Sequence, residues 1–409
     1  PTGLASSLNA NTNQYDGRGD AYLGDKDHFS GTYHYRGTLP FTQAALPPAL
    51  DVNNTRIPNY SHIARGNWDH TFSPTILNNF NFGYLDLPTK VYNSSDCCVG
   101  DVPAIAGVYN NTDHVSQLRF SDNYQGFGGN ADFFTVRPTF AFNNTTTWVK
   151  GRHQIKFGGE FRNVKYPTET RANGSGTFNF DRNATGIRGI QSGNPMASFL
   201  LGAVSNANAT FYSLPRWNPT AYSVSFFVGD QWRATSKLNI TMGLRWDLFT
   251  PSVEAEDRTS FFDPYGANPT AGGRSGRMAF AGDQYGEASF GARYPERLFK
   301  KAFGPRLGIA YQLDEKTVIR TGYALNYMQN YYPGWNGGIG TDGFNFNASF
   351  DSQLGGLQPA FYLQNGFPQN FSKPPFTTSG YLNGLNAPNY RPFDANELPY
   401  AQQWNFTIT

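Results

Sequence analysis

The chain alternates between apolar and polar side chains over long stretches, a pattern that predicts β-strands rather than helices. The clearest example runs from Ala221 to Phe249. Successive side chains of a strand point to opposite faces, so one face of its second half is apolar and the other is polar. The apolar positions are Leu238, Ile240, Met242, Leu244, Trp246 and Leu248, and the polar face carries Asn239, Thr241, Gly243, Arg245 and Asp247.

The first half of the same stretch repeats the alternation, from Tyr222 to Trp232. The residues between the two halves, 233–237, are few enough to close a hairpin. Asp230 is the one break in the apolar face of the first half, and it lies close to the predicted turn. We therefore predict two paired strands with matching faces.

These strands are long enough to cross a membrane. The segment from Leu238 to Leu248 rises roughly 3.3 Å per residue and, at a tilt near 45°, spans roughly 25 Å, the height of the apolar band of an outer-membrane barrel. A slip of one residue in register would turn Arg245 toward the apolar side, where it costs about 2–4 kcal/mol in lipid. A soluble sandwich would show the same alternation, so this hairpin alone does not identify the solvent.

Five pairs of such segments and one half-pair follow each other along the chain, with turns of about 3–5 residues inside the pairs. The pairs lie near residues 13–36, 63–85, 132–163, 221–249 and 304–327, and the half-pair starts near 398. Much longer connections separate them, at 37–60, 87–131, 164–219, 251–302 and 328–398. Short turns alternating with long loops are typical of transmembrane barrels and rare in compact soluble domains. We predict an all-β, antiparallel transmembrane barrel with about eleven visible strands, short periplasmic turns, long extracellular loops and no required helix.

Composition agrees with this architecture. Aromatic residues make up 16% of the chain and charged residues 15%, as expected for an aromatic-girdled wall around a polar interior. The mean hydropathy of −0.52 argues against a helical membrane protein, and a net charge of +2 without a basic cluster argues against a nucleic-acid partner. The chain starts at Pro1 without a signal peptide and ends inside a strand-like pattern, so we interpret residues 1–409 as an internal part of one barrel domain.

Several segments together resemble a known family. They are NQYDGRGDAYLGDKDHFSGTY near the start, GRHQIKFGGEFR (151–162), FFVGDQWRATSKLNITMGLRWD (226–247), FGPRLGIAYQLDEKTVIRTGYALNY (303–327) and LPYAQQWNFTIT (398–409). In this order and spacing they resemble the barrel of TonB-dependent outer-membrane receptors, and in particular their Oar-like branch. The resemblance covers most of the predicted strands and few of the loops.

The resemblance implies a barrel of roughly 22 strands in the outer membrane of a Gram-negative bacterium, of which this chain would supply about half. It also implies a plug domain in the lumen and energised import through the TonB complex of the inner membrane. No plug, no N-terminal domain and no energy-coupling box is recognisable in this sequence, so uptake is expected of a longer parent protein. The solute would be bulky, such as an oligosaccharide, a peptide or a siderophore; the alternative is a passive porin or a surface adhesin without energy coupling.

Six charged residues are predicted to face the lumen: Lys156, Glu160, Arg245, Asp247, Arg306 and Arg320. One interpretation is that they compensate one another and hydrogen-bond to a plug. The other is that some of them line a polar path for the solute, because lumen residues tune selectivity. The sequence leaves both open.

Five aromatic residues of the predicted loops are candidates for ligand binding: Tyr331, Tyr332 and Trp335 in the fifth loop, with Tyr109 and Trp217 elsewhere. Their ring faces would suit sugars or apolar peptide side chains. Packing at the membrane surface would explain them equally well.

No catalytic or cofactor site is predicted. The six histidines are scattered, and neither an HExxH nor a GxSxG motif occurs. His28 and His34 share the inward face of one strand, where we expect hydrated lumen side chains rather than metal ligands. Cys97 and Cys98 are adjacent in the second loop, and a vicinal disulfide, a cross-link between copies and two free thiols all remain open.

The assigned facing can be tested in one strand. We expect Leu244→Arg to disrupt membrane insertion, because an Arg near the bilayer midplane costs about 2–4 kcal/mol. Thr241→Arg, on the opposite face, should be tolerated. The amount of folded, heat-resistant protein in outer-membrane fractions measures both variants, and equal losses would contradict the facing.

Overall fold

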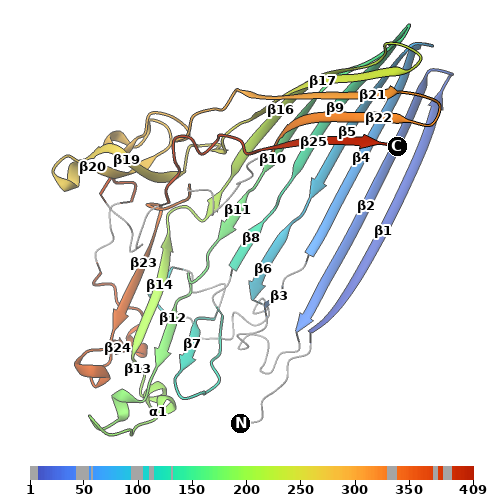
Figure 1. Ribbon diagram of the computed structural model, residues 1–409. Helices are drawn as coiled ribbons and strands as arrows, with labels where there is room; N and C mark the ends of the chain where they lie inside the picture. Colours follow the sequence, from blue (N-terminus) through green and yellow to red (C-terminus); the bar gives the residue numbers. More distant parts are fainter. Residues whose placement is uncertain are drawn as a thin grey trace.

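The computed structural model describes residues 8–42, 55–56, 59–93, 105–109, 115–129, 132–328, 339–371, 376–380 and 389–409. Eleven long strands form one curved wall, in which each long strand pairs antiparallel with the long strand that follows it in the chain (Figure 1). They are β1 (Leu8–Leu23), β2 (Asp27–Thr42), β4 (Asn59–Ser73), β5 (Ile76–Asp86), β9 (Thr139–Lys150), β10 (His153–Lys165), β16 (Pro219–Arg233), β17 (Leu238–Phe249), β21 (Ala302–Gln312), β22 (Val318–Tyr327) and β25 (Tyr400–Ile408). The predicted antiparallel wall of about eleven strands is confirmed.

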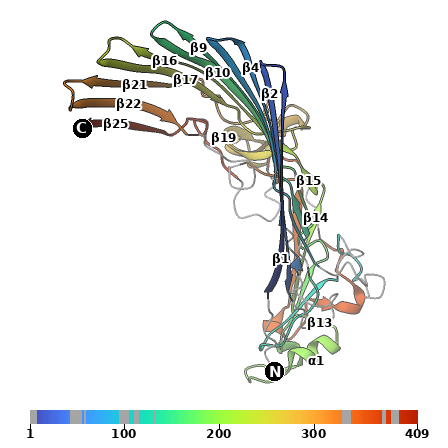
Figure 2. The ribbon, with the colours of Figure 1, turned by 90° about the vertical axis from the view of Figure 1, so that its right-hand side faces the viewer.

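The wall is open. Strands β1 and β25 form its two edges, and within the described residues they do not pair with each other. Figure 2 shows the wall as an arch that runs from β1 to β25. Hairpin turns join neighbouring long strands at one end only, as the spacing of the sequence predicted, and Gly24 and Gly151 take positive φ angles of 66° and 60° in two of them.

The register of the wall separates apolar from polar side chains as predicted. On one face, Leu244 lies opposite Val228 of β16 and Pro305 of β21. On the other face, Thr241 lies opposite Gln231 and Gly308. Leu244 is 44% exposed and Val228 is 50% exposed, so no second layer of the described chain covers the apolar face at these positions. An extended apolar face of this kind suits a lipid environment.

Polar residues on the apolar face satisfy one another. Asp230 accepts a hydrogen bond across the strand pair from His153, with Nδ1 and Oδ2 2.6 Å apart, close to the turns that end β16 and begin β10. Farther into the wall, Asn78 of β5 donates to Asn144 at 3.0 Å and to Thr146 at 2.8 Å, both on β9. These pairings reduce the cost of placing polar groups on a face that meets hydrocarbon.

The long connections are folded, and we call the part of the molecule that they build the cap. It lies at the end of the wall opposite the hairpin turns (Figure 1). Its largest sheet has the strand order β23-β14-β12-β7, formed by β7 (Gln117–Phe120), β12 (Thr177–Phe180), β14 (Asn206–Tyr212) and β23 (Asn345–Asp351). Two smaller sheets pair β13 (Ala203–Val204) with β24 (Phe361–Tyr362), and β19 (Ser260–Asn268) with β20 (Arg274–Phe280).

Short strands and helical turns complete the cap. The wall extends into it through β3 (Thr55–Arg56), β6 (Thr89–Asn93), β8 (Asp132–Thr135), β11 (Thr168–Thr170), β15 (Arg216–Trp217) and β18 (Val253–Glu254). Three-residue 3-10 helices are η3 (Asn183–Thr185), η4 (Pro269–Ala271), η5 (Gly286–Ala288), η6 (Leu354–Gly356) and η7 (Leu363–Asn365). The described residues contain no helix with the length and apolar character needed to cross a membrane.

One helix corrects the expectation that none is present. It is α1 (Pro195–Leu200), a six-residue element in the connection between β10 and β16. Asn194 caps its N-terminus by accepting a hydrogen bond from the backbone amide of Met196 at 2.8 Å, and proline occupies its first position. Phe199 of α1 packs against Phe180, so tertiary packing stabilises a helix too short to form alone.

The buried core of the described residues lies mainly in the cap rather than in the wall. Phe178, Phe180 and Phe346 are at most 4% exposed, and they form one cluster with alanines of β14 and β23. Partly buried phenylalanines from other connections surround this cluster. The cap therefore buries its apolar side chains as a water-soluble domain does, and this packing holds the connections in fixed positions.

Candidate functional site

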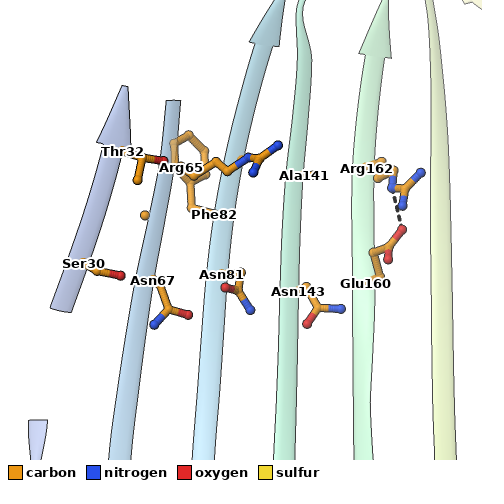
Figure 3. A pocket seen from close by; sticks show the side chains of 12 residues that line it. Ser30, Thr32, Arg65, Asn67, Asn81, Phe82, Ala141, Asn143, Glu160 and Arg162 are labelled. Carbon is orange, nitrogen blue, oxygen red and sulfur yellow. Dashed lines mark ion pairs between the residues drawn. The ribbon is translucent and has the colours of Figure 1, made fainter. Parts of the chain in front are cut away.

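The polar face of the wall carries a hollow of about 500 Å³ between β2 and β10 (Figure 3). Amide side chains form a row at its centre, because the register places Asn67 opposite Asn81 and Asn81 opposite Asn143. Asn79, in the next row, donates to Asn67 at 2.7 Å. This region therefore presents uncharged hydrogen-bonding groups, flanked by Arg65 on one side and by the ion pair of Glu160 and Arg162 on the other.

His28 lies on the same face, between two carboxylates. Its Nε2 is 3.1 Å from Asp20 and its Nδ1 is 3.3 Å from Asp69. Asp20 also pairs with Arg18 at 2.8 Å, and His34 pairs with Asp16. No group of three or more histidine, cysteine, aspartate or glutamate side chains in the described ranges is arranged to hold a metal ion.

Four of the predicted lumen charges come together around a second hollow of about 150 Å³: Glu160, Arg245, Asp247 and Arg306. Lys156 and Arg320 are on the same face of the wall, nearer the hairpin turns, and both are exposed. The six residues therefore share one face, as the alternation predicted, but only four of them are neighbours of one hollow.

The charges around the second hollow have partners within the wall. Arg245 donates to Asp247 at 2.8 Å and to Ser225 at 2.8 Å, and Ser225 donates to Asp247 at 2.7 Å. Asp247 is 5% exposed. Arg306 donates to Asn326 at 2.9 Å. This geometry favours mutual compensation over an open charged path for these residues.

The candidate loop aromatics divide into three groups. Tyr109 is 36% exposed and forms an edge-to-face pair with Tyr212, with ring centroids 5.4 Å apart. Trp217 is 4% exposed, donates from its indole to Thr259 at 3.0 Å and belongs to a core cluster with Phe261. This burial corrects the expectation for Trp217, because its ring faces are covered by protein. Tyr331, Tyr332 and Trp335, and likewise Cys97 and Cys98, lie outside the described residues.

A buried ion pair joins two separate connections of the cap. Arg391 and Glu296 are 5% and 4% exposed, and their Nε and Oε1 atoms are 2.6 Å apart. These two residues come from different connections, on either side of the hairpin formed by β21 and β22. The pair therefore fixes two long connections against each other.

Glu254 is the most deeply buried carboxylate of the cap, at 1% exposure. It accepts hydrogen bonds from the Arg258 guanidinium at 2.7 Å and from the backbone amides of Glu256 and Arg258 at 2.9 and 3.0 Å. Burial acts to raise the pKa of the Glu254 carboxyl, but these hydrogen bonds outweigh it and hold the pKa below the ordinary value of 4.5.

A family model described as "Outer membrane beta barrel domain" matches residues 2–409. The chain belongs to this family. Its place is the outer membrane of a Gram-negative bacterium, and the expectation of an outer-membrane β-barrel is confirmed. No curated protein matches the chain.

Solved structures of outer-membrane barrels are similar to this member of the family at low sequence identity. The outer membrane transporter YddB from Escherichia coli is 12% identical, with a TM-score of 0.41, over 78% of this chain and 40% of that one. The siderophore receptor PiuA from Acinetobacter baumannii is 14% identical, with a TM-score of 0.40, over 84% and 46%. The ferripyoverdine receptor of Pseudomonas aeruginosa is 9% identical, with a TM-score of 0.42, over 85% and 40%. This chain therefore spans less than half the length of these proteins.

The buried contact between Arg245 and Asp247 predicts a stability effect. Asp247→Ala should lower the free energy of unfolding by about 1–3 kcal/mol, because it leaves the Arg245 guanidinium without its charged acceptor. Adding Arg245→Ala should cost less than the sum of the single changes. Urea unfolding in lipid vesicles measures all three variants, and additive effects would show that the pair is not coupled.

The hydrogen bonds to Glu254 predict how cap stability depends on pH. A carboxylate with a depressed pKa contributes stability above its unfolded value of 4.5, and this contribution is lost as the pH falls through the folded pKa. Glu254→Gln should therefore lower the thermal midpoint of the cap at neutral pH, and its effect should shrink as the pH falls below 4.5. Near-ultraviolet circular dichroism measures both. Glu287→Gln, at an exposed carboxylate elsewhere in the cap, is the control and should change neither value.

Proposed function

We propose that this chain is part of the barrel of a TonB-dependent receptor that imports a bulky solute across the outer membrane. The observation that carries the proposal is the ordered cap at one end of a lipid-facing wall. A general diffusion pore needs only a polar lumen, whereas a receptor needs a fixed surface that recognises its solute before transport. The buried core of the cap and its buried ion pair would hold such a surface in a fixed shape.

Further strands complete the barrel in this proposal. Within the described residues, β1 pairs with β2 alone and β25 with β22 alone, and in a membrane the backbone groups of such edges require a neighbouring strand. A closed barrel of roughly 22 strands would satisfy both edges. The residues 1–409 are then one part of that barrel domain, with outer-membrane lipid against the apolar face.

The polar face of the wall would contact a plug domain in this arrangement. Its amide row and the hydrogen-bonded charges around the two hollows offer many donors and acceptors to the surface of a plug. The plug and the TonB complex are partners that the proposal assigns to the complete protein. The candidate solutes of this proposal are an oligosaccharide, a peptide or a siderophore.

Conductance and cross-linking of the complete protein test this function without knowledge of the solute. In planar lipid bilayers a plugged receptor should show no steady channels, and in cells it should cross-link to TonB. Stable open channels together with no cross-link to TonB would instead identify a passive porin. A closed protein without a cross-link to TonB would favour an adhesin.

A further inference from the structure

The four-stranded sheet of the cap has two contrasting faces. One face is buried in the phenylalanine cluster and carries Leu118, Phe120, Phe178, Phe180, Ala207, Ala209, Phe211, Phe346, Ala348 and Phe350. By the same register, the opposite face carries Gln117, Arg119, Thr177, Asn179, Asn206, Asn208, Thr210, Tyr212, Asn345, Asn347, Ser349 and Asp351. We call this second surface the amide face.

The register arranges the amide face in rows that cross all four strands. One row consists of Gln117, Thr177, Asn208 and Ser349, and the next consists of Arg119, Asn179, Asn206 and Asp351. Neighbouring strands lie about 4.8 Å apart, and same-face residues of one strand are separated by about 6.8 Å. The side chains therefore form a regular array of amide and hydroxyl groups.

The array is nearly free of charge. Arg119 and Asp351 are its two charged members, and they lie on the two edge strands, β7 and β23, with the neutral residues between them. The solvated surface of a soluble domain usually carries about 25–35% charged residues of both signs. Each amide offers donors and an acceptor together, which matches a ligand that carries many hydroxyl groups and no net charge.

Hydrogen bonds hold part of the array in position. Asn173, in a left-handed turn with φ of 60°, donates to Asn208 at 2.6 Å and accepts from Thr177 at 2.9 Å. Asn179 donates to Asn206 at 2.7 Å. By contrast, Asn347 and Ser349 are exposed, and their side chains make no hydrogen bond within the part of the chain that the structure describes. The face thus combines ordered amides with polar groups that remain open to a ligand.

An aromatic pair borders one end of the array. Tyr212 is the last residue of β14, and its hydroxyl donates to the carbonyl of Ala172 at 2.6 Å, which fixes the ring. Tyr109 reaches this ring from another connection and is 36% exposed. Aromatic rings provide apolar contact area at little cost in conformational entropy, and they pack against the C–H faces of sugar rings.

We propose that the amide face, together with Tyr109 and Tyr212, is the site that captures the solute, and that the solute is a neutral oligosaccharide. This inference rests on the proposed function and names its substrate class. An anionic ligand would require a cluster of basic side chains, whereas Arg119 is the one basic residue in the array. The remaining groups match alternating hydroxyl donors and acceptors along a sugar chain.

Glycan binding to the complete, detergent-solubilised protein tests the proposal. The probes are neutral oligosaccharides of glucose, xylose, mannose and galactose, measured by calorimetry. At least one should bind, and Tyr109→Ala should weaken it by about two- to twelvefold, because a ring contact contributes about 0.5–1.5 kcal/mol. Asn347→Arg should abolish binding by placing a long cation on an edge strand of the array, next to its neutral groups. Asn347→Ala should weaken binding without altering the shape of the cap.

Ser275→Arg is the matched control, because Ser275 is also an exposed strand residue of the cap but lies in the β19–β20 hairpin. It should leave glycan binding unchanged. Absence of binding by every neutral oligosaccharide, or binding that Tyr109→Ala and Asn347→Arg leave intact, would overturn the proposal, as would binding of acidic glycans or peptides alone. Glycan binding does not depend on TonB, so a protein that binds glycan but does not cross-link to TonB would refute the import function and retain this site.

Discussion

The wall depends on the absence of water from the hydrocarbon core of a membrane. A polar group that meets lipid has no solvent to bond with, so each strand must turn its polar side chains to a single face and hold its register against slippage. The exceptions follow the same rule. Asp230 has His153 as its partner, and Asn78 is bonded to Asn144 and Thr146. These polar residues of the lipid-facing surface are therefore hydrogen-bonded to one another across neighbouring strands.

The strands of the cap show the same alternation of apolar and polar side chains, but they are surrounded by water instead of lipid. In the wall, apolar side chains such as Leu244 and Phe226 point away from the protein and remain exposed. In the cap, Phe178 and Phe346 point inward, and Asn347, the residue after Phe346, is exposed on the opposite face. One chain thus contains two kinds of amphipathic sheet, and the change between them occurs where the long strands end. The site and the membrane anchor are consequently parts of one continuous fold.

The alternation of the sequence was sufficient to predict the wall, because strand facing depends on a period of two that is visible without any long-range contact. It also placed Arg245, Asp247 and Glu160 on one face. It did not reveal that Trp217 is buried, because a tryptophan in an irregular connection has no period from which burial can be inferred.

Other features required tertiary contacts that sequence spacing does not encode. The helix α1 is stabilised by Phe199 packing on Phe180 and would be too short to predict from its own residues. The amide face is built from segments far apart in the chain, so its rows appear only when β7, β12, β14 and β23 are aligned. The alternation of β14 and β23 was present in the sequence, within stretches that we had assigned to loops.

The assembly of the largest cap sheet from three separate connections has a consequence for biogenesis. Strand β23 pairs with β14 across more than a hundred residues of intervening chain, including β16, β17, β21 and β22. Contacts so distant in sequence form late, because closing a long loop costs conformational entropy. This cost falls once the intervening segments are already in position. The amide face would then form only after most of the wall is in place, and a protein that stalls during insertion would lack this surface.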